Sequence, residues 1–204
     1  MGGMNSDDAT PTDLGGHFLI AETELQDPNF FRTVVLLIHH TDEGAFGLVV
    51  NRESEVTVGE VLDSVEGTAL EDVPVFVGGP VQQNYVFALH NGIPRQYRSE
   101  HTEEPTSGIF FEPSFGHVIE YVQSEDYLLS LGPDVPRIRV FAGYSGWGAG
   151  QLEAELQEEV WFINHASGDV IFQAEPTEGW KTALSKKGGF YRIVAETGFK
   201  PSNN

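Results

Sequence analysis

The chain contains no cysteine and has no long hydrophobic run. Without cysteine it can form no disulfide, offers no thiolate nucleophile and cannot hold zinc or an iron–sulfur cluster through sulfur. No apolar stretch approaches the roughly 20 residues that span a bilayer, and the polar start, MGGMNSDDATPTDLGG, lacks the apolar segment of a signal peptide. We therefore expect a cytoplasmic protein without a membrane segment, and a disordered lead-in over residues 1–15.

Basic residues are scarce: 11 Lys and Arg stand against 31 Asp and Glu, for a formal net charge of −20. Nucleic-acid binding depends on Lys and Arg that release counterions from phosphates. The sequence offers only isolated basic pairs, Arg137/Arg139 and Lys186/Lys187. We therefore expect no direct nucleic-acid contact, and a protein or a small anionic ligand as partner, with the oligomeric state left open.

The strand pattern is irregular. With 204 residues, 40% of them hydrophobic, the chain can build one sizeable core, and we expect a single domain over residues 16–200. Thr33–His39 predicts a strand buried on both faces, and residues 46–52 predict its hairpin partner after a turn at Gly44. Further strands are expected at residues 73–77, at 84–90 antiparallel to them, and at 108–112, 117–122, 137–144, 161–164 and 190–196.

Short helices are predicted between these strands. Thr57 and Glu60 have the spacing of a capping box, and apolar residues follow on one helical face as far as Val65. Other helices are expected at residues 124–131, 151–160 and 177–187, with a glycine-dense turn at 145–150. This irregular alternation predicts an α+β fold with a mixed or antiparallel sheet.

The glycine-dense segment Gly143–Gly150 departs from two phosphate-binding motifs. A phosphate loop needs Lys and then Ser or Thr where Ala149 and the following glycine stand. A dinucleotide fingerprint needs its third glycine at Gln151, and Glu153 would repel a pyrophosphate at the helix start. We therefore interpret the glycines as residues that allow close packing.

Two other patterns give weak grounds for catalysis or metal binding. Ser145 lies between a strand and a helix, as in a nucleophile elbow, but Trp147 replaces the last glycine of that motif. His39 and His40 are adjacent on a predicted strand, so their side chains should point to opposite faces and cannot ligate one ion. We assign no catalytic residue, no metal ligand and no cofactor.

Arginines mark both ends of the predicted hairpin. Arg32 precedes the first strand, and Asn51 and Arg52 end the second, so the three can meet at one end. Guanidinium groups recognise carboxylates and phosphates, which makes a small anionic ligand one interpretation. The alternative is that the arginines pair with neighbouring carboxylates such as Asp27 and hold the loops in place.

Four blocks carry a family resemblance: GHFLIAETELQDPNFFRTVVLL, GAFGLVVNR, VFVGGPV and GYSGWGAGQLEAEL. In this order they resemble the YqgE/AlgH family of bacterial proteins, whereas residues 95–123 match that pattern poorly. The resemblance implies a compact single α+β domain of mixed, partly open, branching β-sheets with flanking short helices, in the cytoplasm. One member is named as a transcriptional regulator, but the family has no settled activity or catalytic residues.

The resemblance also suggests a binding cleft, because polar groups beside an aromatic wall are typical of ligand sites. It implies a small-ligand or protein-binding module with a regulatory role. The alternative is a hydrolase-like enzyme that uses a carboxylate or His90 as general base in the same pocket. The candidate ligand-binding residues are Arg32, Asn51, Arg52, His90, Trp147, Gln151 and Glu155.

Overall fold

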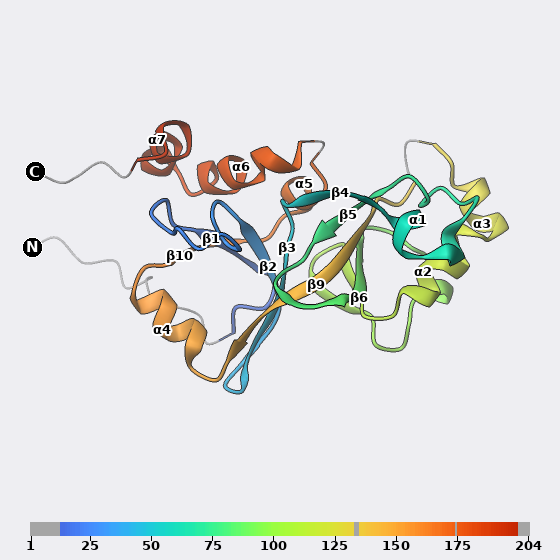
Figure 1. Ribbon diagram of the computed structural model, residues 1–204, viewed down its shortest axis with the longest axis horizontal. Helices are drawn as coiled ribbons and strands as arrows, with labels where there is room; N and C mark the ends of the chain where they lie inside the picture. The colour runs from blue at the N-terminus through green and yellow to red at the C-terminus, as the bar shows by residue number, and fades with distance from the viewer. Residues whose placement is uncertain (1–12, 133–134, 174, 200–204) are drawn as a thin grey trace, which may run out of the picture.

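A branched and curled β-sheet organises the molecule (Figure 1). The computed structural model describes residues 13–132, 135–173 and 175–199. Among these residues the sheet has ten strands. In chain order they are β1 (His17–Ala21), β2 (Val34–Thr41), β3 (Gly44–Val49), β4 (Glu53–Thr57), β5 (Pro74–Val77), β6 (Val81–His90), β7 (Glu103–Thr106), β8 (Ile109–Glu112), β9 (Ile138–Gly148) and β10 (Trp161–His165).

The sheet is mostly antiparallel and curls into a half-barrel. Its main path runs β10-β1-β2-β3-β9-β6-β8-β7, while β4 pairs with β5, and β5 also pairs with β9. The β5–β9 pair is parallel and the others are antiparallel. The predicted α+β class with a mixed sheet is confirmed. The expected pairing of residues 73–77 with 84–90 is wrong, because β9 lies between β5 and β6.

Strand β9 is the branch point of the sheet. Its first half pairs with β5 on one side and β6 on the other, whereas its second half pairs with β3. Residues 145–148, expected in a turn, therefore belong to a strand, because β3 supplies hydrogen-bond partners that local sequence does not reveal. The turn is limited to Ala149 and Gly150, after which α4 begins.

Glycines allow the backbones to meet at this branch. A Cβ atom on Gly78 would lie 2.3 Å from the carbonyl oxygen of Gly143, and one on Gly79 would lie 2.2 Å from the Tyr144 backbone. Both distances are too short for any side chain. The glycines therefore serve close packing, as interpreted from the sequence, but within strands and their junction.

The helices are short and lie on both sides of the sheet. They are α1 (Val58–Val61), α2 (Phe115–Val122), α3 (Glu125–Leu129), α4 (Gln151–Gln157), α5 (Gly168–Ile171), α6 (Gly179–Ser185) and α7 (Gly189–Thr197), with 3-10 turns η1 (Asp63–Val65), η2 (Arg95–Tyr97) and η3 (Pro176–Glu178). The capping box before α1 is confirmed, since the Thr57 N–H donates to Glu60 Oε2 at 2.8 Å. The helix itself ends at Val61, and the apolar pattern continues through η1.

Two segments that we expected as strands are helices. Residues 117–122 lie in α2 and residues 190–196 in α7. In α2 the buried residues Phe115, Val118 and Val122 recur every three or four positions. The helical period outweighs the strand preference of the β-branched residues in this segment, because a helix places the apolar side chains on one face.

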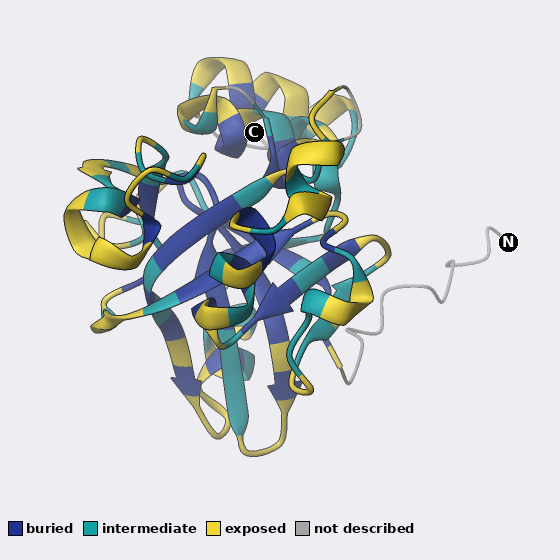
Figure 2. Ribbon diagram, turned by 90° about the vertical axis from the view of Figure 1, so that its right-hand side faces the viewer, coloured by how far each residue is buried: buried dark blue, intermediate teal, exposed yellow. Residues whose placement is uncertain are grey.

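Among the described residues the core forms two hydrophobic clusters. Figure 2 shows the buried residues in dark blue. The larger lies between the β1–β2–β3 region and α5–α7, where the Trp180 indole N–H donates to the Ala21 carbonyl at 2.8 Å. The smaller lies under α1 and α2. Residues 1–12 of the expected lead-in lie outside the described residues, but Leu14 is fully buried in the larger cluster. No helix among the described residues has the length and hydropathy needed to cross a membrane.

Candidate functional site

Arg32, Asn51 and Arg52 hold the loop that leads into β2. The buried Asn51 amide accepts the Val34 N–H at 2.8 Å and donates to the Arg32 carbonyl at 3.0 Å. The Arg52 guanidinium donates to the Asn29 carbonyl at 2.8 Å. Burial lowers the pKa of Arg52, while the negative charge of Asp27 opposes that shift. The three residues meet at one end of the hairpin, as expected, and the side chains of Asn51 and Arg52 bind backbone groups.

Little space remains beside this cluster. The cavity that Arg52 lines with Asn29 and Gln83 has a volume of about 20 Å³, which is enough for roughly one water molecule. The Arg32 guanidinium lies 5.3 Å from the centre of the Trp180 ring and so covers the core. The cavity beside Arg52 is therefore too small for a metabolite.

Trp147, Gln151 and Glu155 form a closed hydrogen-bond network. The Glu155 carboxylate accepts the indole N–H groups of Trp147 at 2.9 Å and Trp161 at 2.7 Å, and the Gln151 amide at 2.9 Å. The expected shared helix face of Gln151 and Glu155 is confirmed. Phe30 packs on both indoles, with ring centres 6.3 and 5.5 Å apart. The network fastens α4 and the loop before β2 to the sheet.

His90 lies elsewhere, paired with Glu112. Both side chains are fully buried, and His90 Nε2 is 3.4 Å from a Glu112 oxygen. Because His90 Nδ1 accepts the Ile93 N–H at 3.2 Å, the ring proton is on Nε2 and is donated to the carboxylate. The same carboxylate accepts the Thr102 hydroxyl at 2.6 Å and the Ser99 N–H at 3.3 Å.

Both members of this buried pair have lowered pKa values. Burial is the main cause for His90, because it disfavours the charged ring. Burial alone would raise the pKa of Glu112, but hydrogen bonds from His90, Thr102 and Ser99 outweigh that effect and hold it below its ordinary value. At neutral pH the pair is therefore a neutral imidazole beside an ionised carboxylate.

Acidification should destabilise the protein through this pair. A group whose pKa is lower in the folded state contributes stability that is complete above its unfolded pKa and is lost as pH falls toward its folded pKa. For His90 that loss begins at about pH 6.5, and Glu112 adds to it at lower pH. Urea unfolding between pH 7.5 and 5.5 should show a shallower pH dependence in His90→Gln than in the wild type. Equal slopes would contradict this assignment.

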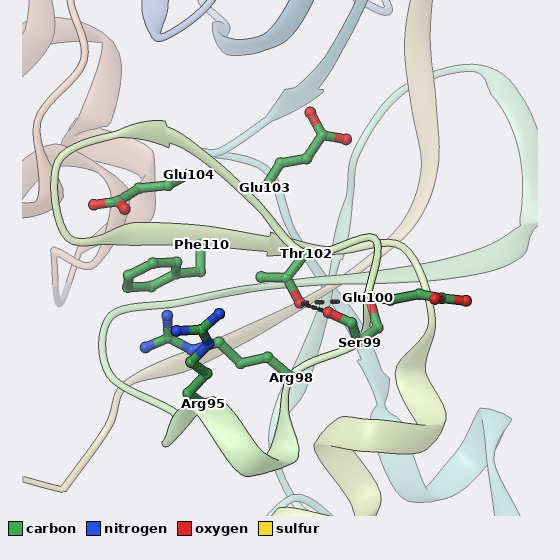
Figure 3. A pocket seen from close by; sticks show the side chains of 8 residues that line it. All are labelled: Arg95, Arg98, Ser99, Glu100, Thr102, Glu103, Glu104 and Phe110. Atoms are coloured by element: carbon green, nitrogen blue, oxygen red, sulfur yellow. Dashed lines mark hydrogen bonds between the residues drawn. The ribbon is translucent and has the colours of Figure 1, made fainter.

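A pocket of about 620 Å³ is lined in part by Phe110, Ser99 and Thr102, the residues that contact the buried pair (Figure 3). The Phe110 ring stacks on His90 with centres 5.2 Å apart, and the Arg98 guanidinium carbon lies 3.7 Å from the Phe110 centre. Arg98 Nε donates to the Ile93 carbonyl at 2.6 Å, which fixes the side chain. The pocket is lined by Arg95, Arg98, Ser99, Glu100, Thr102, Glu103, Glu104 and Phe110. We call it the arginine pocket.

The opposite face of the β7–β8 hairpin carries a different recess. Glu103 is directly opposed to Phe111, so these side chains share the face away from Phe110. On that face Phe46, Phe87 and Phe111 line an apolar recess of about 390 Å³. Glu103 also pairs with His39 at 3.1 Å, which links β7 to β2 across the open side of the half-barrel.

The remaining sequence hypotheses are resolved by contacts. Ser145 is fully buried, and its hydroxyl donates to the Gly78 carbonyl at 3.2 Å, so it is not exposed as a nucleophile elbow requires. His40 contacts Glu153 at 2.8 Å, whereas His39 contacts the β7 carboxylate described above. The two histidines face different partners, as strand geometry predicted.

Sequence reasoning missed the arginines of this pocket. Arg95 and Arg98 belong to no motif, and they lie in the region 95–123 that matches the family pattern poorly. Their spacing of three residues in a chain with few bases was the available signal. Of the predicted site residues, His90 alone contacts the wall of the arginine pocket, through Phe110. The other six support the hairpin loop and α4.

A family model described as AlgH-like matches residues 18–192. The chain belongs to the AlgH-like family. The UPF0301 protein of Chlorobaculum tepidum is 34% identical over 190 residues, which are 93% of this chain and 95% of that protein. The UPF0301 protein of Pseudomonas aeruginosa strain LESB58 is 35% identical over 190 residues, 88% of this chain and 92% of that protein. The predicted family is confirmed.

Solved structures agree with this AlgH-like assignment. The solution structure of the AlgH protein from Pseudomonas aeruginosa has a TM-score of 0.65 and 30% identity, and covers 97% of this chain and 100% of that one. The crystal structure of protein DIP2367 from Corynebacterium diphtheriae has a TM-score of 0.72 at 21% identity and covers 94% of each chain, which shows the fold alone. None of these names states an activity, so function rests on the geometry of this AlgH-like chain.

Proposed function

We propose that this protein is a cytoplasmic binding module for a small anionic ligand, with a regulatory role, and that the ligand binds in the arginine pocket. The supporting observation is that two guanidinium groups line one pocket without carboxylate partners. Within the described part of the chain, neither Arg95 nor Arg98 forms an ion pair. In a chain with 31 acidic residues, unpaired neighbouring arginines favour an external anion.

The size and rigidity of the pocket support binding of a metabolite. Its volume of about 620 Å³ is within the range of roughly 300–1,000 Å³ typical of small-molecule sites. Arg98 is held by the Ile93 carbonyl and the Phe110 ring, so little side-chain entropy is lost when its two terminal nitrogens bind an anion.

In the hydrolase-like alternative, three side chains that could act as the base, His90, Glu112 and Glu155, are engaged by other groups of the protein. His90 is fully buried and already donates to Glu112, and burial lowers its pKa. The Glu112 carboxylate is also buried and accepts three hydrogen bonds. Glu155 is engaged by two indoles and an amide. A general base must reach the proton that it abstracts, so none of these three side chains is placed to act as that base.

Binding should depend on Arg98 and not on arginines elsewhere. We expect a thermal-shift panel of carboxylates, inorganic phosphate and nucleotides to identify an anion whose affinity falls at least about tenfold in Arg98→Ala, because a charged hydrogen bond contributes about 1.5–3 kcal/mol. Arg192→Ala is the matched control, since Arg192 is an exposed arginine that lines a separate recess on α6–α7. Weaker anion binding in Arg192→Ala together with unchanged binding in Arg98→Ala would contradict the proposal. A panel in which no compound binds would also contradict it.

A further inference from the structure

The arginine pocket has two walls of opposite charge. Figure 3 shows Arg95 and Arg98 on one side of the Phe110 ring and Glu104 on the other. Glu104 is exposed, and one of its oxygens accepts the Gly108 N–H at 2.8 Å, which orients the carboxylate and leaves its second oxygen available. Glu100 adds a further exposed carboxylate to the lining.

Neither wall neutralises the other. Among the described residues, Glu104 forms no ion pair with a basic side chain. Arg95 and Arg98 form no ion pair with a carboxylate. The partly buried Phe110 ring lies between the charges and offers an apolar surface. A ligand with only negative charges would gain at the arginines and be repelled at Glu104, so the pocket discriminates against polyanions.

We propose that the ligand of the arginine pocket is a zwitterion with an apolar body, of the class of a free amino acid or short peptide. The inference rests on the proposed function, because it names the class of anion that this site accepts. The ligand carboxylate binds Arg95 and Arg98, its ammonium group binds Glu104, and its apolar part packs beside Phe110. The pocket volume of about 620 Å³ accommodates a molecule of this size.

The test compares ligands that differ by one charge. Calorimetry on the full chain measures binding of the twenty amino acids and a set of dipeptides, each beside the deaminated acid with the same carbon skeleton, such as leucine beside 4-methylpentanoate. We expect at least one zwitterion to bind tenfold or more tightly than its deaminated acid. Glu104→Gln should abolish that preference while affinity for the deaminated acid stays the same or rises, because glutamine keeps the oxygen that accepts the Gly108 N–H.

The outcomes separate this inference from the proposed function. Equal binding of zwitterions and deaminated acids, or an unchanged preference in Glu104→Gln, overturns the zwitterion assignment. If those acids or inorganic phosphate still bind and Arg98→Ala weakens them, the anion site stands. If no zwitterion binds but phosphate does, the inference is also overturned and the anion site again stands. If no zwitterion, no deaminated acid and no phosphate binds, both the zwitterion assignment and the anion site are wrong.

Discussion

Glu112→Ala is expected to lower the free energy of unfolding by about 3–5 kcal/mol, because three donors lose a charged acceptor, at roughly 1–3 kcal/mol each and without strict additivity. The substitution leaves the His90 N–H, the Thr102 hydroxyl and the Ser99 N–H without their acceptor. His90 and Glu112 are both fully buried, so water cannot readily replace the lost carboxylate. Urea unfolding at pH 7.5, followed by circular dichroism, measures the change.

Two variants control for the Glu112 result. Glu66→Ala, in the turn after η1, removes an exposed carboxylate and should change stability by less than about 0.5 kcal/mol. Glu112→Gln keeps an acceptor oxygen and the side-chain volume. Its decrease in the free energy of unfolding should therefore fall between those of the two alanine variants. A change below about 1 kcal/mol in Glu112→Ala would show that the buried network contributes little to stability.

Glu155→Ala is expected to cost about 2–4 kcal/mol, because hydrogen bonds to a charged group contribute roughly 1.5–3 kcal/mol each and are not additive. The variant leaves the indole N–H groups of Trp147 and Trp161 unpaired, and these side chains are only 6% and 5% exposed. It also frees α4 from β9. Unfolding experiments should therefore show lower stability and a red-shifted tryptophan emission of the native state.

The matched control for this second change lies on the same helix turn. Glu158 is exposed and follows α4 directly, so Glu158→Ala alters the net charge equally without touching an indole. Its stability should stay within about 0.5 kcal/mol of the wild type. If both variants lose the same amount of unfolding free energy, the effect comes from the charge on the helix, and the hydrogen bonds to the indoles are not its cause.

Local pattern was sufficient for much of the fold. The β-branched run before His39 gave β2 with both faces buried, and the spacing of Thr57 and Glu60 gave the capping box of α1. Local pattern failed where contacts between residues distant in the sequence determine the secondary structure. The continuation of β9 past Gly143 depends on pairing with β3, about a hundred residues earlier in the chain. In α2 the helical period of the buried residues outweighed β-forming side chains, and in α7 the partly buried Tyr191 and the buried Val194 and Ala195 share one helical face.

The candidate site was predictable in part. Sequence reasoning identified His90, but its partner Glu112 is 22 residues away, and local spacing could not show that the two are buried together. Asn51, Arg52 and Glu155 have the chemistry of ligand-binding groups, yet each is engaged by backbone or indole partners that only folding brings near. Arg95 and Arg98 were missed because nothing in the sequence shows that a polar loop faces a hollow.

The central position of β9 has a consequence for the order of folding. This strand begins at Ile138, yet it pairs with β3, β5 and β6, which all precede it in the chain. During synthesis these three strands emerge with unpaired backbone groups, and such edges invite association with other chains. A nascent chain shorter than about 148 residues therefore lacks the strand that joins its halves. Until β9 leaves the ribosome, β3, β5 and β6 each lack one strand partner, and the new chain is most exposed to association with other chains.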